Sequence, residues 1–436
     1  MKIRAAVLEE IGVERPYAGT LPLKIQEVDL EGPGPGEVLV KIAVAGLCHS
    51  DLSVIDGNRP RPVPMVLGHE ASGVVEEVGS YVDDLKPGDH VVFVFMPSCG
   101  HCAPCSEGRP ALCEPGAVSN GAGELLGGVN RLKWKGQPAY HHVGVSSFAD
   151  YATVSRRSLV KIDREVPLDI AGLIGCAVLT GAGAVFNTGD VKPGGSTAIV
   201  GLGGVGLAAL IGAAAAGAET IVAVDRLDSK LEFARELGAT HTFNSDDPDV
   251  VAKVREATKG GVEAALEFAG SVKALEFSYA ITRRGGTTIT AGLPHPKAML
   301  SLPAVSLVAE ERTLKGSYIG SGVPSRDIPR FLGLYKRGKL PVAREVGRDQ
   351  PHAIIEIGAR DEAVLGEPDR WRHYLGQRQP AVAGQRLAPS FECARHGNRK
   401  RAHGVATAAG FTRQCDLVRD RVIHSRRGAQ GRGAQP

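Results

Sequence analysis

Four cysteines within one short segment have the spacing of a metal-binding loop. Two residues separate each of the first three, and seven residues precede the fourth. Sulfur ligands at such spacing favour a tetrahedral zinc ion, and zinc held by four thiolates keeps no open coordination position. The segment therefore predicts a structural zinc site, formed by Cys99, Cys102, Cys105 and Cys113.

An iron–sulfur cluster is the main alternative for this loop, because ferredoxin-like sites also use C-x2-C-x2-C before a Cys-Pro pair. Here Glu114 separates Cys113 from Pro115, and the sequence contains no second set of cluster ligands. Disulfides are also less favoured, since five of the eight cysteines occupy motif-like positions in a chain of 436 residues. Zinc remains the prediction.

A second set of candidate ligands begins with Cys48 and the tripeptide Gly68-His69-Glu70. Zinc held by a Cys/His set keeps a fourth position for water or substrate, so this site would be chemical. Spacing alone does not join Cys176 to these residues. A lone cysteine is more often a small buried hydrophobic residue than a ligand, and that interpretation stays open.

A glycine-rich motif directly follows an apolar run and opens an Ala-rich segment. This is the context that the dinucleotide-binding G-x-G-x-x-G sequence requires. Its glycines allow a tight turn and let the backbone approach a pyrophosphate at a helix N-terminus. The predicted cofactor-binding residues of this motif are Gly201, Gly203, Gly204, Val205 and Gly206.

Asp225 ends the next apolar run, 19 residues after Gly206. A carboxylate there would accept hydrogen bonds from the adenosine ribose and would repel a 2′-phosphate, so NAD is predicted over NADP. Arg226 and Lys230 qualify this prediction, because a cation beside the ribose tolerates a phosphate. Lys230 is nevertheless included among the cofactor-binding residues. The alternative role for Asp225 is a strand-end helix cap.

The elements that must position these residues fall into two kinds. Roughly the first 155 residues contain alternating apolar runs, such as 38–44, 73–78 and 90–95, broken by Pro/Gly turns, which predict a small, partly open barrel. From about 195 to 320, apolar runs alternate with helical segments. That alternation predicts a parallel sheet with helices on both faces, and hence an α/β protein.

Composition gives expectations about location. The N-terminus has no apolar signal sequence, which predicts a cytoplasmic protein. The segment 196–218 has no charge over 23 residues and reaches the length of a membrane span, but its six glycines argue against one.

These motifs together resemble the zinc-dependent alcohol dehydrogenases of the medium-chain dehydrogenase/reductase family. The resemblance covers about residues 1–341. The matching stretches are Gly46-Leu47-Cys48-His49-Ser50-Asp51, residues 67–75, the four-cysteine loop, His141-His142 with residues 147–151, Leu173-Ile174-Gly175-Cys176, and the glycine motif.

The resemblance implies that Cys48, His69 and Cys176 hold a catalytic zinc, with Glu70 near the metal. The zinc content would then be two ions per chain. Ser50 matches the hydroxyl that begins a proton relay, and His49 matches the basic residue beside the cofactor pyrophosphate. The implied reaction moves a hydride from the carbinol carbon to the nicotinamide.

The implied architecture has a β-rich, GroES-like catalytic domain and a Rossmann doubly wound domain. The predicted boundaries are 1–177 for the catalytic domain with its structural zinc lobe, 178–320 for the NAD-binding domain, 321–341 for a partial return to the catalytic domain, and 342–436 for an atypical tail.

The predicted function is zinc-dependent oxidation of a primary or secondary alcohol, aromatic alcohols included, with hydride transfer to NAD. Phe95 matches a substrate-pocket position and favours aromatic substrates, although barrel packing is an equal alternative. A thiol-adduct formaldehyde dehydrogenase and an inactive NAD- and zinc-binding protein are the alternative functions. A homodimer or homotetramer is expected, with no membrane or nucleic-acid partner.

Two departures from the family are visible. Ser53 occupies a position where many relatives have a histidine. After residue 341 the chain has no recognisable family ending, and residues 342–436 carry 16 Arg and one Lys. Our hypothesis is an aberrant, out-of-frame and disordered tail; a nucleic-acid-binding tail is the alternative.

Overall fold

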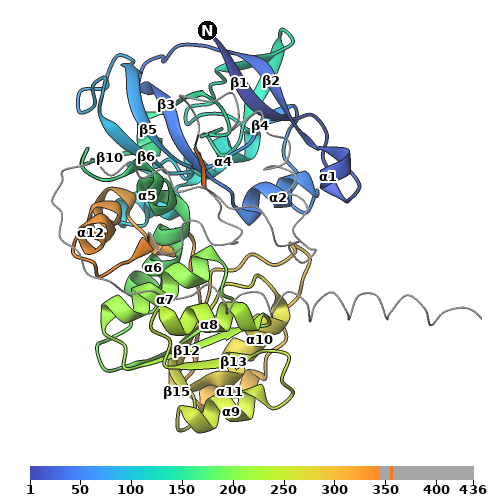
Figure 1. The fold of residues 1–436 in the computed structure, drawn as a ribbon, viewed down its shortest axis with the longest axis vertical. Helices are drawn as coiled ribbons and strands as arrows, with labels where there is room; N and C mark the ends of the chain where they lie inside the picture. Colours follow the sequence, from blue (N-terminus) through green and yellow to red (C-terminus); the bar gives the residue numbers. More distant parts are fainter. Residues whose placement is uncertain (343–353, 357–436) are drawn as a thin grey trace, which may run out of the picture. The chain divides into compact units, whose positions relative to one another are not determined.

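The N-terminal β-rich part forms two separate sheets in the computed structural model, which describes residues 1–342 and 354–356 (Figure 1). One is a closed barrel with the strand order β1-β2-β7-β8-β4. Alternate residues Ile3, Ala5 and Val7 of its first strand are buried in the barrel core. The barrel strands are β1 Lys2–Leu8, β2 Leu23–Leu30, β4 Met65–Val66, β7 Leu132–Trp134 and β8 Gln137–His141.

The second sheet contains the apolar runs from which a barrel was predicted. Its order is β10-β6-β5-β3-β17, with β9 also paired to β3, and neighbouring strands run antiparallel. The runs therefore form an open sheet beside the barrel. The strands are β3 Glu37–Gly46, β5 Glu70–Val78, β6 His90–Phe93, β9 Tyr151–Ser155, β10 Leu159–Ile162 and β17 Ile354–Glu356.

Short helices lie between the strands of this part, next to several of the candidate ligands. They are α1 Tyr17–Thr20, α2 His49–Ile55, α3 Ala103–Ser106, α4 Glu114–Ala122, α5 Leu168–Leu173 and α6 Leu179–Gly183. The last two belong to one continuous helix, Leu168–Thr188, which is long and apolar enough to span a membrane. Its most apolar 18-residue stretch is 83% buried within the protein, so it is a core helix.

The predicted α/β part is confirmed as a six-stranded sheet in which every neighbouring pair is parallel. Its order, β13-β12-β11-β14-β15-β16, is that of a doubly wound dinucleotide-binding sheet. The strands are β11 Ser196–Val200, β12 Thr220–Asp225, β13 His241–Asn244, β14 Val262–Glu267, β15 Thr282–Thr290 and β16 Thr313–Gly316.

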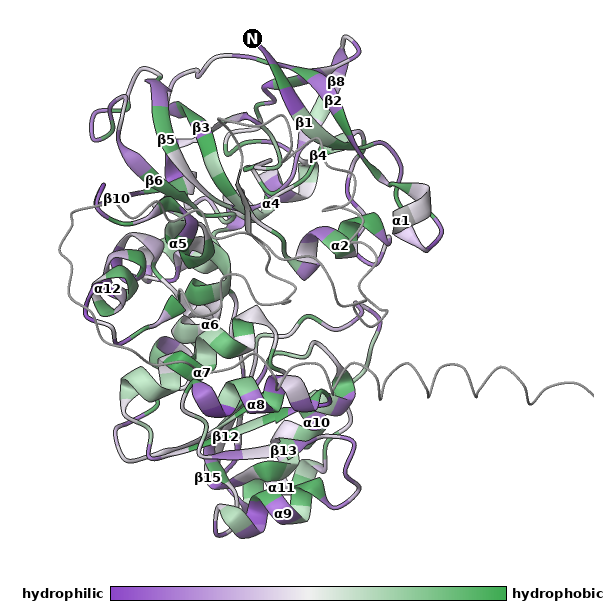
Figure 2. Ribbon diagram, viewed as in Figure 1, coloured by the Kyte–Doolittle hydropathy of each residue, from purple (hydrophilic) through white to green (hydrophobic). Residues whose placement is uncertain are grey.

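Helices connect these parallel strands. They are α7 Gly204–Ala216, α8 Asp228–Glu236, α9 Val250–Ala257, α10 Val272–Ile281 and α11 Ala304–Ala309. Figure 2 shows apolar residues along α7 and a mixed surface on α8. The uncharged segment 196–218 is thus a strand, a turn and a buried helix.

The last described helix, α12 Pro324–Lys336, leaves the parallel sheet. Its Phe331 ring packs 5.9 Å from that of Phe186, and Lys336 forms an ion pair with Asp163. Contacts with β10 and the Leu168–Thr188 helix bring the chain back toward the N-terminal part. We retain the boundaries 1–177, 178–320 and 321–341 as a proposal.

One strand, β17, lies in the segment where no family-like ending was expected. It pairs antiparallel with β3, with Ile354 opposite Gly46 and Glu356 opposite Val44 (Figure 1). Three residues gave too short a pattern for sequence-based detection. The other predictions for the tail concern residues that lie outside the described part of the chain.

We predict that β17 stabilises the sheet beside Cys48, because it hydrogen-bonds to the edge of β3 two residues before that cysteine. A chain ending at residue 342 should unfold about 2–5 °C below one ending at residue 356. Differential scanning calorimetry of the two truncations measures this difference. Equal unfolding temperatures would show that the strand adds nothing.

Candidate metal centres and cofactor site

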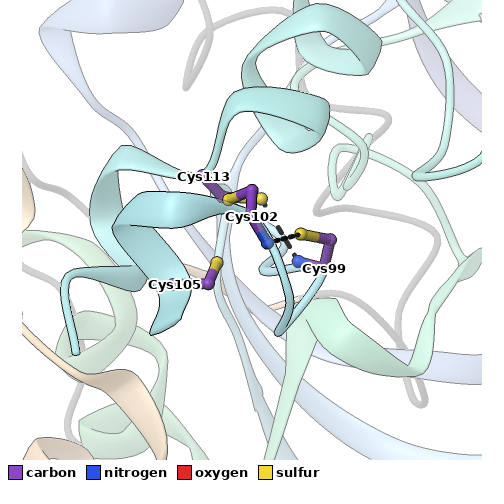
Figure 3. Close-up of side chains that lie close together, drawn as sticks. All are labelled: Cys99, Cys102, Cys105 and Cys113. Carbon is purple, nitrogen blue, oxygen red and sulfur yellow. Dashed lines mark hydrogen bonds between the residues drawn. The ribbon is translucent and has the colours of Figure 1, made fainter. Parts of the chain in front are cut away.

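The four cysteines of the predicted structural site converge in the structure. Their sulfur atoms all lie within 4.8 Å of one another, on the turns around α3 and before α4 (Figure 3). Backbone N–H groups of His101 and Cys102 face the Cys99 sulfur at 3.5 and 3.3 Å. The Cys113 sulfur accepts from the N–H groups of Cys99 and Gly116 at 3.2 and 3.4 Å.

This donor set fits a zinc ion. The His101 N–H lowers the pKa of Cys99 to about 6, which favours a thiolate. Burial raises the pKa of Cys105 to about 12, so four thiolates at neutral pH require a cation among them. The six cysteines in the described part of the chain are free thiols, which excludes a disulfide in this loop.

The second predicted set also converges, although its members come from three distant segments. Ligand atoms of Cys48, His69, Glu70 and Cys176 lie within 4.8 Å of one another, and all four residues are buried. The Cys176 sulfur is 3.6 Å from His69 Nε2. Two sulfurs and one imidazole nitrogen are a donor set that suits zinc with a further position for another ligand.

A distortion of the core helix places Cys176. Residues Ile174–Val178 form a π-helical turn between α5 and α6, a feature often found at functional sites. A Cβ atom on Gly175 would lie 2.1 Å from the carbonyl oxygen of Phe93, so the helix packs directly on the end of β6. This close packing fixes the position of Cys176 relative to the other donors.

Asp51 orients His69 within the set. Its carboxylate is fully buried, lies 3.2 Å from His69 Nδ1, and accepts the Gly68 N–H at 3.1 Å. Burial would raise the pKa of Asp51, but the His69 and His142 imidazoles outweigh it and lower that pKa. The aspartate therefore stays ionised, which leaves His69 Nε2 free to face the metal position.

His142 is a residue that the sequence analysis did not include in the site. Its Nδ1 lies 3.1 Å from Asp51, and its ring is 5.4 Å from that of His69. Its loop contains two non-glycine residues with positive φ, Val143 at 45° and Ser146 at 56°, and such strain persists only where surrounding structure enforces it. The adjacent pair His141-His142 was the available sequence signal.

The other predicted residues lie around this set. Glu70 is fully buried, and its side chain leaves no room for a Cβ on Gly46. His49 is exposed and Ser50 is half-buried, both on the first turn of α2 directly after Cys48. The Phe95 ring stands edge-on to His69, with ring centres 5.2 Å apart.

The glycines of the cofactor motif have separate structural roles. Gly201 has φ of 93°, and a Cβ there would lie 2.6 Å from the Ala269 nitrogen. A Cβ on Gly206 would lie 1.8 Å from the Gly201 carbonyl oxygen. Around Gly203, by contrast, no described atom lies within 4 Å of such a Cβ, which leaves the open approach that a pyrophosphate needs. Gly204 and Val205 begin α7.

Asp225 lies at the end of β12 as predicted, and it also braces the glycine turn. Its carboxylate accepts the Leu202 N–H at 2.8 Å and lies 3.8 Å from Lys230 Nζ. The adjacent Arg226 pairs with Asp246, with Nε and Oδ1 3.0 Å apart. Both cations that qualified the NAD prediction therefore have carboxylate partners.

Comparison with known proteins agrees with this geometry. A family model for the alcohol dehydrogenase GroES-like domain matches residues 34–164, and one for zinc-binding dehydrogenases matches residues 204–337. The NDMA-dependent alcohol dehydrogenase of Amycolatopsis methanolica is 41% identical over 83% of this chain and 96% of its own. Geraniol dehydrogenase of Castellaniella defragrans is 38% identical over 83% of this chain and 96% of its own.

A solved structure shows the same likeness in three dimensions. The benzyl alcohol dehydrogenase of Acinetobacter calcoaceticus superposes with a TM-score of 0.76 at 36% identity, over 82% of this chain and all of that one. These matches and the two donor sets describe a zinc-binding dehydrogenase with a structural four-cysteine site, a catalytic Cys/His site and a nicotinamide cofactor. The chain therefore belongs to the zinc-containing alcohol dehydrogenases of the medium-chain dehydrogenase/reductase family.

Proposed function

We propose that the protein is an NAD-dependent dehydrogenase that oxidises primary or secondary alcohols, aromatic ones included, to aldehydes or ketones. The convergence of Cys48, His69 and Cys176 from three segments of chain is the observation that carries this proposal. Each chain would bind two zinc ions. A zinc ion in the Cys/His set would supply Lewis-acid stabilisation of negative charge on the alcohol oxygen.

The residues beside this set have distinct proposed roles. Ser50, half-buried after Cys48, would receive the alcohol proton, and the exposed His49 would face the cofactor pyrophosphate. Glu70 is a buried carboxylate near the metal position. The Phe95 ring stands edge-on to those of His69 and Tyr318 and would give the substrate an aromatic contact beside the metal position.

The charges around Asp225 support NAD as the cofactor. Asp225 would accept hydrogen bonds from the ribose, with Lys230 beside it. A 2′-phosphate would have to displace Asp246 from Arg226 or approach the Asp225 carboxylate. Either change costs free energy that NAD does not require.

The edge of the parallel sheet supports a homo-oligomer. Strand β16 is exposed along its length, and nearby Val305, Val308 and Met299 are 74%, 82% and 84% exposed. An uncovered strand edge with apolar neighbours is suited to pairing with a second copy of the chain. We propose a dimer or a tetramer in the cytoplasm.

Two relatives support the substrate class, since one is named for benzyl alcohol and another for geraniol. The thiol-adduct formaldehyde dehydrogenase remains the enzymatic alternative. An inactive NAD- and zinc-binding protein is the alternative of another kind, and NADH binding without turnover by metal-replete protein would select it.

Substitutions should have different effects at the two metal sites. We expect two zinc ions per native chain by mass spectrometry and turnover of benzyl alcohol with NAD. Cys176→Ser should abolish turnover while NADH binding, followed by fluorescence, persists. Cys105→Ser should instead remove the structural zinc and lower the unfolding temperature. A single native zinc that survives Cys176→Ser would contradict the proposed reaction.

Substitutions of Gly203 and Gly206 should likewise have different effects, one on cofactor affinity and the other on stability. Gly203→Ala fills open space, so we expect the Kd for NAD to rise about tenfold or more with little change in unfolding temperature. Gly206→Ala creates a collision with Gly201 and should destabilise the fold by about 1–3 kcal/mol. Calorimetric titration and thermal unfolding measure the two effects. Equal affinity of Gly203→Ala for NAD would disprove the assigned pyrophosphate position.

His142 should act on the catalytic zinc through Asp51. His142→Phe removes the imidazole nitrogen beside Asp51, and catalytic zinc affinity should fall about 10–100-fold by chelator competition. His142→Asn keeps a donor near the Nδ1 position and should restore most of the affinity. The matched control is His141→Phe, since buried His141 accepts the Arg131 N–H. An equal loss of zinc affinity in both Phe variants would reduce His142 to a packing role.

A further inference from the structure

Two arginines, Arg59 and Arg61, lie on the loop between α2 and β4. Arg59 donates from Nη2 to the Pro294 carbonyl at 3.1 Å, and Arg61 donates from Nη1 to the Asn120 carbonyl at 3.0 Å. Both side chains are half-buried. Pro294 lies on the loop that follows β15 of the parallel sheet, and Asn120 lies on α4.

A chain of contacts connects Arg61 to the catalytic metal set. The Asn120 amide donates to the Phe95 carbonyl at 2.7 Å. The Phe95 ring lies 5.2 Å from that of His69 and 6.2 Å from that of Tyr318. Desolvation raises the pKa of the Tyr318 phenol, and the nearby charge of Arg61 partly opposes that rise.

The two guanidinium groups have no carboxylate partner within residues 1–342. Their hydrogen bonds there go to single backbone carbonyls, and no acidic oxygen of this range lies within 4.0 Å of either group. The nearby Asp56 pairs with Arg15 at 3.6 Å. Burial lowers the pKa of Arg59, and the charge of Asp56 opposes this shift in part. Half-buried cations without a counter-ion are costly, and a bound anion would offset that cost.

We propose that Arg59 and Arg61 bind an anionic group at the far end of the substrate, so that the enzyme prefers aromatic alcohols carrying a carboxylate. The inference rests on the proposed function and names its substrate class. Each guanidinium presents five N–H donors in a planar fork, which matches the two oxygens of a carboxylate. The rings of Phe95 and Tyr318 would contact the aromatic body of the substrate between the metal and the arginines.

Two alcohols of the same shape and a smaller one without the para group test the proposal in the zinc-loaded enzyme with NAD. They are 4-(hydroxymethyl)benzoate, its neutral amide 4-(hydroxymethyl)benzamide, and benzyl alcohol. We expect kcat/KM for the carboxylate to exceed that for the amide by about tenfold or more. The preference should decrease with added salt. Equal values, or a preference for the amide, would overturn the proposal.

Substitutions locate the effect. Arg59→Gln and Arg61→Gln should raise KM for the carboxylate alcohol about tenfold while kcat/KM for benzyl alcohol changes little. Arg59→Lys keeps the charge and should retain part of the preference. The control is Arg283→Gln, which removes a guanidinium paired with Glu263 on the surface. A rise in KM for NAD with no change in KM for the carboxylate alcohol would overturn the proposal and assign Arg59 and Arg61 to cofactor binding.

An equilibrium measurement separates this inference from the proposed reaction. Calorimetric titration of the NADH complex with 4-carbamoylbenzoate and with terephthalamide compares a charged and a neutral ligand without any turnover. Tighter binding of the charged ligand, lost in Arg59→Gln, supports the arginine site even if no alcohol is oxidised. Equal binding of the two ligands overturns it.

Discussion

The convergence of buried sulfur and imidazole donors on one point is the constraint on which the rest of the candidate site depends. Cys48, His69 and Cys176 come from the end of β3, the start of β5 and a π-helical turn, and all three are buried. Thiolates this close repel one another and lose hydration, so a metal ion among them would make their convergence favourable. The buried carboxylate of Asp51 and the two imidazoles beside it extend the same electrostatic network outward.

Features contained in one continuous stretch of chain were predictable from the sequence. The four-cysteine loop and the glycine motif carry their geometry in their own spacing, and both formed as expected. The parallel sheet followed from alternating apolar runs, although β13, with its half-buried His241–Asn244, left too weak a hydrophobic pattern to detect. In the N-terminal part, the apolar runs that form β3, β5 and β6 were recognised as strands. Their pairing into an open sheet beside a closed barrel depends on long-range register, which the spacing of residues does not encode.

Features assembled from distant segments were not predictable in this way. Cys176 entered the site only through family resemblance, because nothing in its local sequence marks it as a ligand. His142 reaches Asp51 from a loop whose strained backbone is imposed by its neighbours. Arg59 and Arg61 look like ordinary loop cations in the sequence, and only the folded chain brings Arg59 to Pro294 and Arg61, through Asn120, near Phe95. In each case tertiary packing, and not residue type, gives the side chain its role.

Anomalous diffraction from crystals of the intact protein, measured on both sides of the zinc absorption edge, tests the central claim most directly. The account predicts two zinc peaks per chain, one among the four loop cysteines and one bounded by Cys48, His69 and Cys176 with a further coordination position occupied by solvent. A single peak confined to the cysteine loop, or a second peak held by other residues, would contradict it.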